Sequence, residues 1–129
     1  DMGEVRCDVL DWLAKVDVMI LEFNHDPDLL ASGPYPASVK SRIAGAKGHL
    51  ANKDAGIMLG EIAHNQLQAV VLAHLSKSNN EPALARSIAH DSLREYSARI
   101  LVADQKSPCS MKIPGISEPD GYQQSFPML

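Results

Sequence analysis

The sequence lacks the features that mark several common protein classes. It has no apolar run of about 18 residues and no basic-then-apolar opening segment, so it predicts neither a membrane span nor a secretory signal. It contains no P-loop, nucleophile elbow or Rossmann glycine pattern, which excludes the nucleotide-binding and serine-hydrolase classes that those motifs define. Its two cysteines, Cys7 and Cys109, form neither a CxxC motif nor a disulfide framework. They predict reduced thiols in a cytoplasmic protein.

The composition is that of one globular domain. The chain has 129 residues, of which 45% are hydrophobic and 22% are charged, which is enough apolar material for a core and too little charge for disorder. The sequence opens on Asp1 rather than on methionine. We therefore expect a processed or incomplete chain.

Charge is distributed unevenly along the chain. The net charge of −4 argues against non-specific nucleic-acid binding by the whole surface. Half of the 16 acidic residues lie before position 29, whereas residues 31–53 contain no acid. The same stretch holds four basic residues and one histidine: Lys40, Arg42, Lys47, Lys53 and His49. Acidic groups suit cations and basic groups suit phosphates, although two ordinary solvated faces explain the same distribution.

Apolar periodicity predicts an α/β domain. Helices are expected over 5–15, 27–31, 37–44 and 81–94 and from 52 onward, with Asn52 and Asn80 as N-caps. Strands are expected over 17–23, 69–75 and 99–103, with a short fourth strand at 111–113. This alternation is typical of a parallel sheet, whose strands are apolar on both faces and need cover on both. So few strands predict an incomplete unit with one exposed apolar sheet face and marginal stability.

Side chains suited to metal or phosphate chemistry follow the predicted strands. Glu22, His25 and Asp26 lie at the end of the first strand, and His74 ends the second. Sites in parallel α/β sheets gather at the carboxyl ends of the strands, which places these groups at one edge. Turn formation also explains the first cluster. His74 is either a buried, hydrogen-bonded histidine or a metal ligand.

Two further candidates lie just before predicted helices. Asp1 in Asp-x-Gly offers a carboxylate to a metal, and the alternative role is an N-cap or a plain terminal residue. His49 lies in a glycine-flanked loop before a helix whose N-terminus suits a phosphate oxygen, and a lone surface histidine is the alternative. His64 and His90 fall within predicted helices and are interpreted as ordinary surface residues.

Four sequence elements in a fixed order resemble a known family. NHDP, GPYP, GHL and AHLS, within LEFNHDPDLLASGPYPASVKSRI, GHLANKDAG and LQAVVLAHLSKSNNEPALA, are specific as a set and not singly. They resemble the C-terminal half of metallo-β-lactamase-fold hydrolases, in the ribonuclease Z-related branch that includes bacterial double-stranded DNA exonucleases. The resemblance covers roughly residues 1–105 and implies half of an αββα sandwich. The domain is then expected over 1–113, with a mobile tail over 114–129.

The resemblance implies a site with two divalent metal ions, zinc or manganese. Most of the ligands, in a His-x-His-x-Asp-His motif and a further histidine, belong to the N-terminal half and are absent here. Asp1 matches the bridging aspartate and His74 the last histidine ligand. His49 matches the histidine that acts near the scissile phosphate, and Glu22 its acidic partner. His25 and Asp26 match the branch's NHD element without an assigned role.

The implied function is that of the C-terminal part of a phosphodiesterase, specifically a nuclease acting on DNA or RNA. Lys40, Arg42, Lys47 and Asn52 are the candidate substrate contacts, and the N-terminal half is the expected partner, so the chain alone is expected to be inactive. Relatives often have Ser or Thr where this chain has Ala51, which puts a hydroxyl–phosphate contact in doubt. Two other functions stay open: a small-molecule metallo-hydrolase of the same fold and a non-catalytic interaction module.

Overall fold

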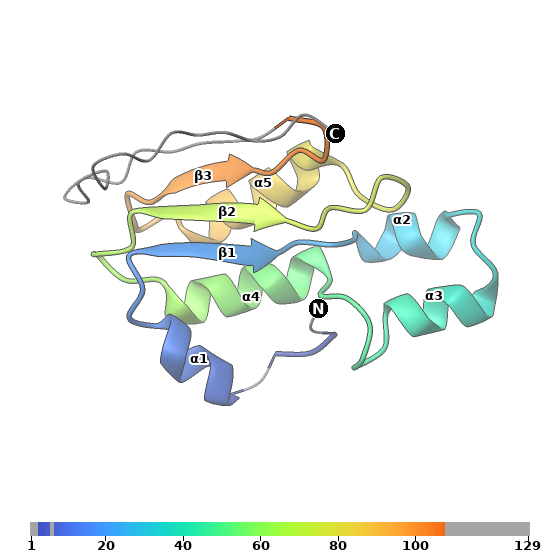
Figure 1. The fold of residues 1–129 in the computed structure, drawn as a ribbon, viewed down its shortest axis with the longest axis horizontal. Coiled ribbons are helices and arrows are strands. Elements are labelled where there is room, and N and C mark those ends of the chain that lie inside the picture. Colours follow the sequence, from blue (N-terminus) through green and yellow to red (C-terminus); the bar gives the residue numbers. More distant parts are fainter. Residues whose placement is uncertain (1–2, 6, 108–129) are drawn as a thin grey trace, which may run out of the picture.

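The fold is a small parallel sheet with helices packed on one face, as a computed structural model shows for residues 3–5 and 7–107 (Figure 1). The sheet has three strands in the order β1-β2-β3: Val18–Glu22, Ala69–Ala73 and Arg99–Val102. Both strand pairs are parallel, with Ile20 opposite Val71 and Val71 opposite Leu101. The predicted α/β alternation and all three strands within the described residues are confirmed. Residues 111–129, with the expected fourth strand and tail, lie outside the described residues.

Five helices connect and flank the strands within the described part of the chain. They are α1 (Cys7–Leu13), α2 (Pro27–Ser32), α3 (Ala37–Ile43), α4 (Asn52–Ile62) and α5 (Pro82–Ser92). The helices α4 and α5 pack on each other and on the sheet, whereas α2 and α3 lie beyond the carboxyl ends of the strands (Figure 1). The expectation that His64 falls within a helix is wrong, because α4 ends at Ile62. None of the described helices is long and apolar enough to cross a membrane.

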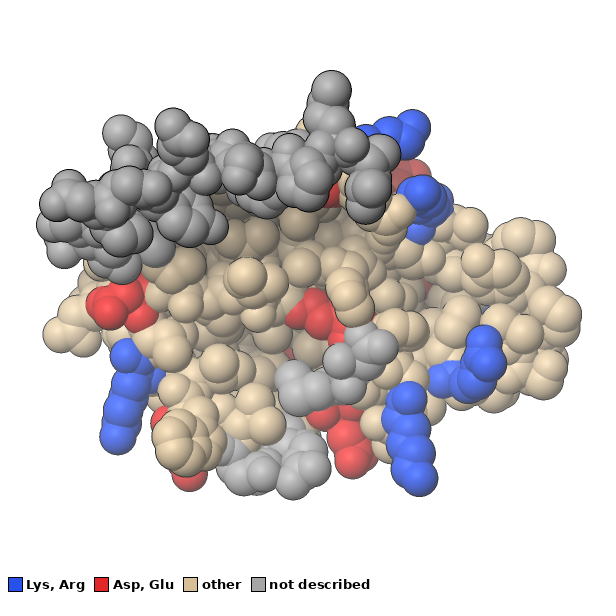
Figure 2. Space-filling view, viewed as in Figure 1, with Lys and Arg blue, Asp and Glu red and all other residues tan. Residues whose placement is uncertain are grey.

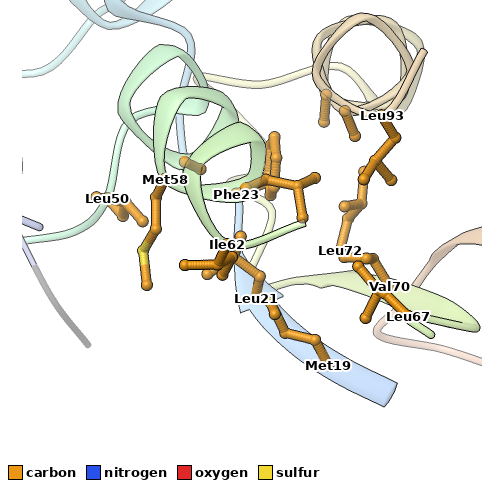
Figure 3. Close-up of a cluster of buried hydrophobic side chains, with 14 residues drawn as sticks. Met19, Leu21, Phe23, Leu50, Met58, Ile62, Leu67, Val70, Leu72 and Leu93 are labelled. Carbon is orange, nitrogen blue, oxygen red and sulfur yellow. The ribbon is translucent and has the colours of Figure 1, made fainter. Parts of the chain in front are cut away.

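The hydrophobic core lies between the sheet and the two long helices (Figure 3). Alternate strand residues point to this side, as the pleat of a strand requires: Met19 and Leu21 from β1, and Val70 and Leu72 from β2. They meet apolar side chains of the helices and loops, all nearly inaccessible to solvent: Leu50, Met58, Leu59, Ile62, Ala85, Ala89 and Leu93. One continuous core therefore fixes the sheet on α4 and α5.

The opposite face of the sheet is apolar and accessible. Ile20, at the centre of β1, is 73% exposed, and its neighbours Val71 and Leu101 are only partly buried. No described helix covers this face. The expected exposed apolar surface is therefore confirmed, and the two-sided apolar pattern of the strands has a described partner layer on one side only.

The helices α4 and α5 are in tight contact at Gly56. A Cβ at this position would lie 2.5 Å from Cγ2 of Ile88, a branched side chain that has little room to move. Gly60, one turn further along α4, has room for a methyl group, since the nearest atom to its Cβ position is Ser92 O at an ordinary van der Waals distance of 3.9 Å. Only Gly56 is therefore required by the packing.

These two glycines give a matched test of helix packing. We expect Gly60→Ala to raise the free energy of unfolding by about 0.5–1 kcal/mol, because alanine favours the helix. We expect Gly56→Ala to lower it by about 1–3 kcal/mol, because the added methyl group forces the helices apart. Urea unfolding of both variants measures the difference. Equal effects of the two substitutions would show that Ile88 does not limit the approach.

Candidate active site

Three titratable side chains converge at the carboxyl edge of the sheet. Glu22 ends β1, His74 follows β2, and His49 lies in the loop before α4. The Nδ1 atom of His49 is 2.7 Å from Oε1 of Glu22, and Nδ1 of His74 is 3.3 Å from the same oxygen. The Glu22 side chain is 10% exposed, against 33% for His49 and 60% for His74. A buried carboxylate thus supports two more accessible imidazoles.

The shared carboxylate fixes how the two imidazoles are used. An ionised carboxylate only accepts hydrogen bonds, so each histidine presents Nδ1 to Glu22 as N–H. In the neutral ring, the unprotonated nitrogen is then Nε2. Metal-binding histidines commonly pass their second N–H to a carboxylate in this way, and the carboxylate orients the ring. Ligand atoms of Glu22, His49 and His74 lie within 4.8 Å of one another, so the group has the donor types and the spacing of a metal site.

A short parallel pairing beyond the end of β1 brings His49 to Glu22. The amide N–H of Asn24 donates to Leu50 O at 3.0 Å, and that of Asn52 donates to His25 O at 2.8 Å. This forms an isolated parallel bridge between His25 and Ala51. The pairing extends the edge of the sheet next to β1, and the loop residue His49 therefore lies beside the strand's last side chain.

Gly48 lets the His49 loop fold tightly against the end of α3. A Cβ at Gly48 would collide with the carbonyl oxygens of Arg42 and Ile43. The adjacent N–H of His49 donates to Ile43 O at 2.9 Å. The glycine before His49 is therefore a requirement of close backbone approach.

His74 takes a backbone conformation that most residues avoid. Its φ is 61°, in the left-handed region, so β2 ends at Ala73 rather than at residue 75 as the apolar run predicts. The amide Nδ2 of Asn24 donates to His74 O at 2.8 Å, and Ser76 N donates to Asn24 O at 2.8 Å. Asn24 thus closes both sides of the turn, and these bonds offset a left-handed cost of about 1–2 kcal/mol.

The Asn80 side chain is the centre of a buried amide network. Its Nδ2 donates to Phe23 O, Asn24 O and Asn52 Oδ1 at 2.8, 2.9 and 3.0 Å. Its Oδ1 accepts from Asn52 Nδ2 at 2.8 Å and from Glu81 N at 2.9 Å. Asn80 therefore ties the loop after β1, the start of α4 and the start of α5 together. The predicted Asn80 cap is wrong, because the structure places Glu81 at the N-cap of α5. Sequence reasoning missed this network, because one asparagine before a helix predicts only a cap.

Asn52 differs from its two sequence expectations. The structure places Ala51 at the N-cap of α4, and Asn52 is the first residue of the helix, so the predicted Asn52 cap is wrong. The Asn52 side chain is fully buried and pairs reciprocally with Asn80. Because the Asn52 amide has no access to solvent, it cannot contact a substrate in this structure.

Two residues of the NHD element, His25 and Asp26, have structural roles that the sequence did not predict. Asp26 caps α2, because its Oδ1 accepts from Asp28 N at 2.9 Å and from Leu29 N at 3.0 Å. His25 is 2% exposed, and its Nδ1 has no hydrogen-bond partner within the described residues. Burial is the main cause that lowers the pKa of His25 below its ordinary value of 6.5, and the nearby His49 lowers this pKa further. His25 is therefore a neutral imidazole in the wall of the site.

A cleft of about 430 Å³ opens in front of the two accessible histidines. We call it the histidine cleft; Asn24, Tyr35, Arg42, His49, His74 and Ser76 are among its lining residues. Of the predicted cationic contacts, Arg42 lines it, Lys40 lines a neighbouring pocket, and Lys47 is exposed. Figure 2 shows Lys and Arg side chains near the end of the molecule where α2 and α3 lie. Asp1, the predicted bridging ligand, is outside the described residues.

Known proteins resemble this chain over most of its length. It is 34% identical over 95 residues to exodeoxyribonuclease YycJ of Bacillus anthracis, covering 74% of this chain and 36% of the relative. It is 35% identical over 85 residues to exodeoxyribonuclease WalJ of Streptococcus pneumoniae serotype 2, covering 66% and 32%. The chain therefore spans about a third of the length of these curated relatives. No protein-family model matches it.

A solved structure identifies the fold. The metallo-β-lactamase-fold protein YhfI of Bacillus subtilis superposes with a TM-score of 0.52 at 17% identity, covering 80% of this chain and 34% of that one. The resemblance to part of a metallo-β-lactamase fold is thus confirmed, and with it the predicted fold class. The similarity to exodeoxyribonucleases confirms the branch that the sequence motifs indicate.

The amide network predicts a large effect of one buried side chain. We expect Asn80→Ala to lower the free energy of unfolding by about 3 kcal/mol, because it leaves several buried polar groups without partners. Asn79 is the matched control: it is also buried, but its Nδ2 donates only to Ser76 Oγ and its Oδ1 has no partner within the described residues. We expect Asn79→Ala to lower the free energy of unfolding by less than Asn80→Ala does. Denaturant unfolding of the two variants measures the difference. Equal losses would show that burial alone, and not the network, sets the cost.

The buried His25 predicts a stability change on acidification. Because its pKa is lowered in the folded state, the unfolded chain takes up the proton more readily below pH 6.5. The free energy of unfolding should therefore fall as the pH falls from about 7 toward 5.5. Urea unfolding at both ends of this window, in wild type and in His25→Gln, measures the contribution. A fall of the same size in the variant would assign it to other groups.

Proposed function

We propose that this chain is the C-terminal part of a metal-dependent nuclease that cleaves phosphodiester bonds of DNA. The observation that carries the proposal is the pair of histidines held by one carboxylate, Glu22, in a cleft that also contains Arg42. The similarity to proteins named exodeoxyribonucleases supports DNA as the substrate over RNA or a small molecule.

The donor set fits a divalent metal centre of this fold. Imidazole nitrogen and carboxylate oxygen suit zinc and manganese alike. We assign His74 as a ligand through Nε2, with Glu22 as the carboxylate that orients it. We assign Asp1 as a second ligand: Gly3, two residues on, lines a pocket together with His49, so the chain reaches the site region just after Asp1. Divalent metal held by these residues would supply the positive charge that activates a water molecule and stabilises the phosphate oxygens.

His49 takes the role of the acid near the scissile phosphate. To donate a proton from Nε2, the imidazole must carry protons on both nitrogens. Oε1 of Glu22, 2.7 Å from Nδ1, stabilises that cation and holds the ring in place. The proton then passes to the leaving oxygen, and the Glu22 carboxylate stays ionised throughout. We expect Arg42, which lines the histidine cleft, to hold the phosphate. The exposed Lys47, and Lys40 once its ammonium leaves Ala31 O, would hold the neighbouring backbone without reading its sequence.

The rest of the fold is the proposed partner of this chain. The accessible sheet face around Ile20 is apolar, and the relatives are about three times as long as the part they share with this chain. A second layer carrying the remaining metal ligands would cover the face and complete the site. The isolated chain is then expected to be inactive.

Three variants of the full-length protein separate the proposed roles. His74→Ala and Asp1→Ala should lower the metal content, because each removes a ligand. His49→Ala should keep the metal and lose DNA hydrolysis by about 10²–10⁴-fold, because it removes only the acid. Elemental analysis and release of nucleotides from a DNA duplex provide the two readouts.

The matched control is His90→Ala, which removes an exposed histidine of α5 that lines neither pocket at His49 and should change neither readout. Unchanged metal content in both His74→Ala and Asp1→Ala would reject the metal assignment. Hydrolysis of small phosphodiesters with no action on DNA would replace the nuclease by a small-molecule hydrolase of the same fold.

A further inference from the structure

A second concavity lies on the other side of His49 from the histidine cleft. We call it the side pocket; it has a volume of about 570 Å³ and lies between the helices α2 and α3 and the start of α4. His49 lines both concavities, whereas His74 and Arg42 line only the histidine cleft. The proposed acid therefore separates two adjoining spaces.

The two spaces differ in chemistry. The histidine cleft contains Arg42 and two imidazoles, which suit an anion. The side pocket is walled mainly by apolar groups, among them Pro27, Leu30, Ala37 and Ala44. Its polar groups are few, and the two charged ones, Lys40 and Asp54, have opposite signs. A mostly apolar concavity with a few polar groups is the usual form of a small-molecule site, and the volume of the side pocket is in the usual range of about 300–1,000 Å³. Apolar walls of this kind suit an uncharged ring system.

Two details of the wall agree with a planar, uncharged occupant. His25 contributes a buried imidazole that burial keeps neutral, so this wall presents a ring without charge. The Nζ atom of Lys40 donates to the carbonyl oxygen of Ala31 at the end of α2, so this ammonium is held at the wall rather than extended into the pocket. Asp54 and Ser41 complete the set of groups able to bond the edge of a base.

We propose that the side pocket binds the deoxynucleoside attached to the scissile phosphate, with the phosphate itself in the histidine cleft. The inference rests on the proposed nuclease function and extends it. A nucleotide has an anionic group joined to a flat, mostly uncharged base and sugar, and this chain has an anion cleft joined to an apolar pocket at His49. His49, the proposed acid, then lies next to the bond that joins the phosphate to the nucleoside.

Adjacent residues at the start of α3 provide a matched test. Ala37 lines the side pocket and Ser38 does not, and both are exposed, so tryptophan is tolerated by the fold at either position. The probes are deoxyadenosine monophosphate and inorganic phosphate, titrated calorimetrically into the metal-loaded full-length protein. We expect wild type and Ser38→Trp to bind the nucleotide at least about tenfold more tightly than phosphate, a difference of about 1.4 kcal/mol. Ala37→Trp should bind both probes about equally.

Ala44→Trp fills the same pocket from the other end of α3 and should repeat the result of Ala37→Trp. Nucleotide affinity that both pocket variants leave unchanged would overturn the inference, as would a wild type that binds the nucleotide no better than phosphate. Release of nucleotides from duplex DNA, measured on the same wild-type protein, tests the proposed function separately. Loss of nucleotide affinity in the pocket variants, with no DNA hydrolysis by wild type, would reject the nuclease and keep the nucleoside pocket.

Discussion

The geometry of the site depends on buried amide groups rather than on the charged residues that carry its chemistry. The Asn80 side chain bonds the backbone after β1, the side chain of Asn52 at the start of α4 and the N–H of Glu81 at the start of α5. Asn24, held in that network through its carbonyl, closes the turn at His74. Three connections far apart in the chain are therefore joined in one place. Glu22 is presented by the sheet, and the two histidines reach it because their loops are tied to the same point. Buried amides suit this task, since each hydrogen bond has a fixed direction and the cost of leaving one unmade is high.

The chemistry follows from one carboxylate serving two imidazoles. Because the Nδ1 atoms of His49 and His74 point to the same oxygen of Glu22, the two rings differ in environment rather than in partner. His74 is the more exposed of the two, and His49 lies between the histidine cleft and the side pocket. The proposed roles, metal ligand for His74 and proton donor for His49, follow from this difference in environment. Substituting Glu22 would therefore disturb both proposed roles at once, whereas each histidine is separable from the other.

The order of the elements was predictable from apolar periodicity, because buried parallel strands and amphipathic helices leave strong local patterns. Glu22 and His74 were predictable as site candidates for the same reason, since both lie at the carboxyl end of a predicted strand. The contact between His49 and Glu22 was predictable only from the family resemblance, because it depends on pairing between His25 and Ala51, which no local pattern encodes. The left-handed turn at His74 was not predictable from local sequence either. His74 and Leu75 continue the apolar run of β2, but a hydrogen bond from the distant Asn24 side chain stabilises a turn there. Asn52 shows the opposite error, since its type favours a cap, but burial beside Asn80 moves it one position into the helix.

The accessible sheet face and the small number of candidate ligands have one physical explanation. A parallel sheet needs apolar cover on both faces, and here the described helices supply it on one. A metal centre built from two imidazoles and a carboxylate leaves Glu22 with two tasks, as the support of both rings and as a ligand, and these compete for the same oxygen atoms. Ligands from a second layer remove that competition, because Glu22 then serves only as an acceptor for the histidines. The layer that would cover Ile20 packs on the sheet whose carboxyl edge holds the site. Burial of the open face and completion of the metal centre would therefore be one structural event, and metal binding should be coupled to the docking of that layer.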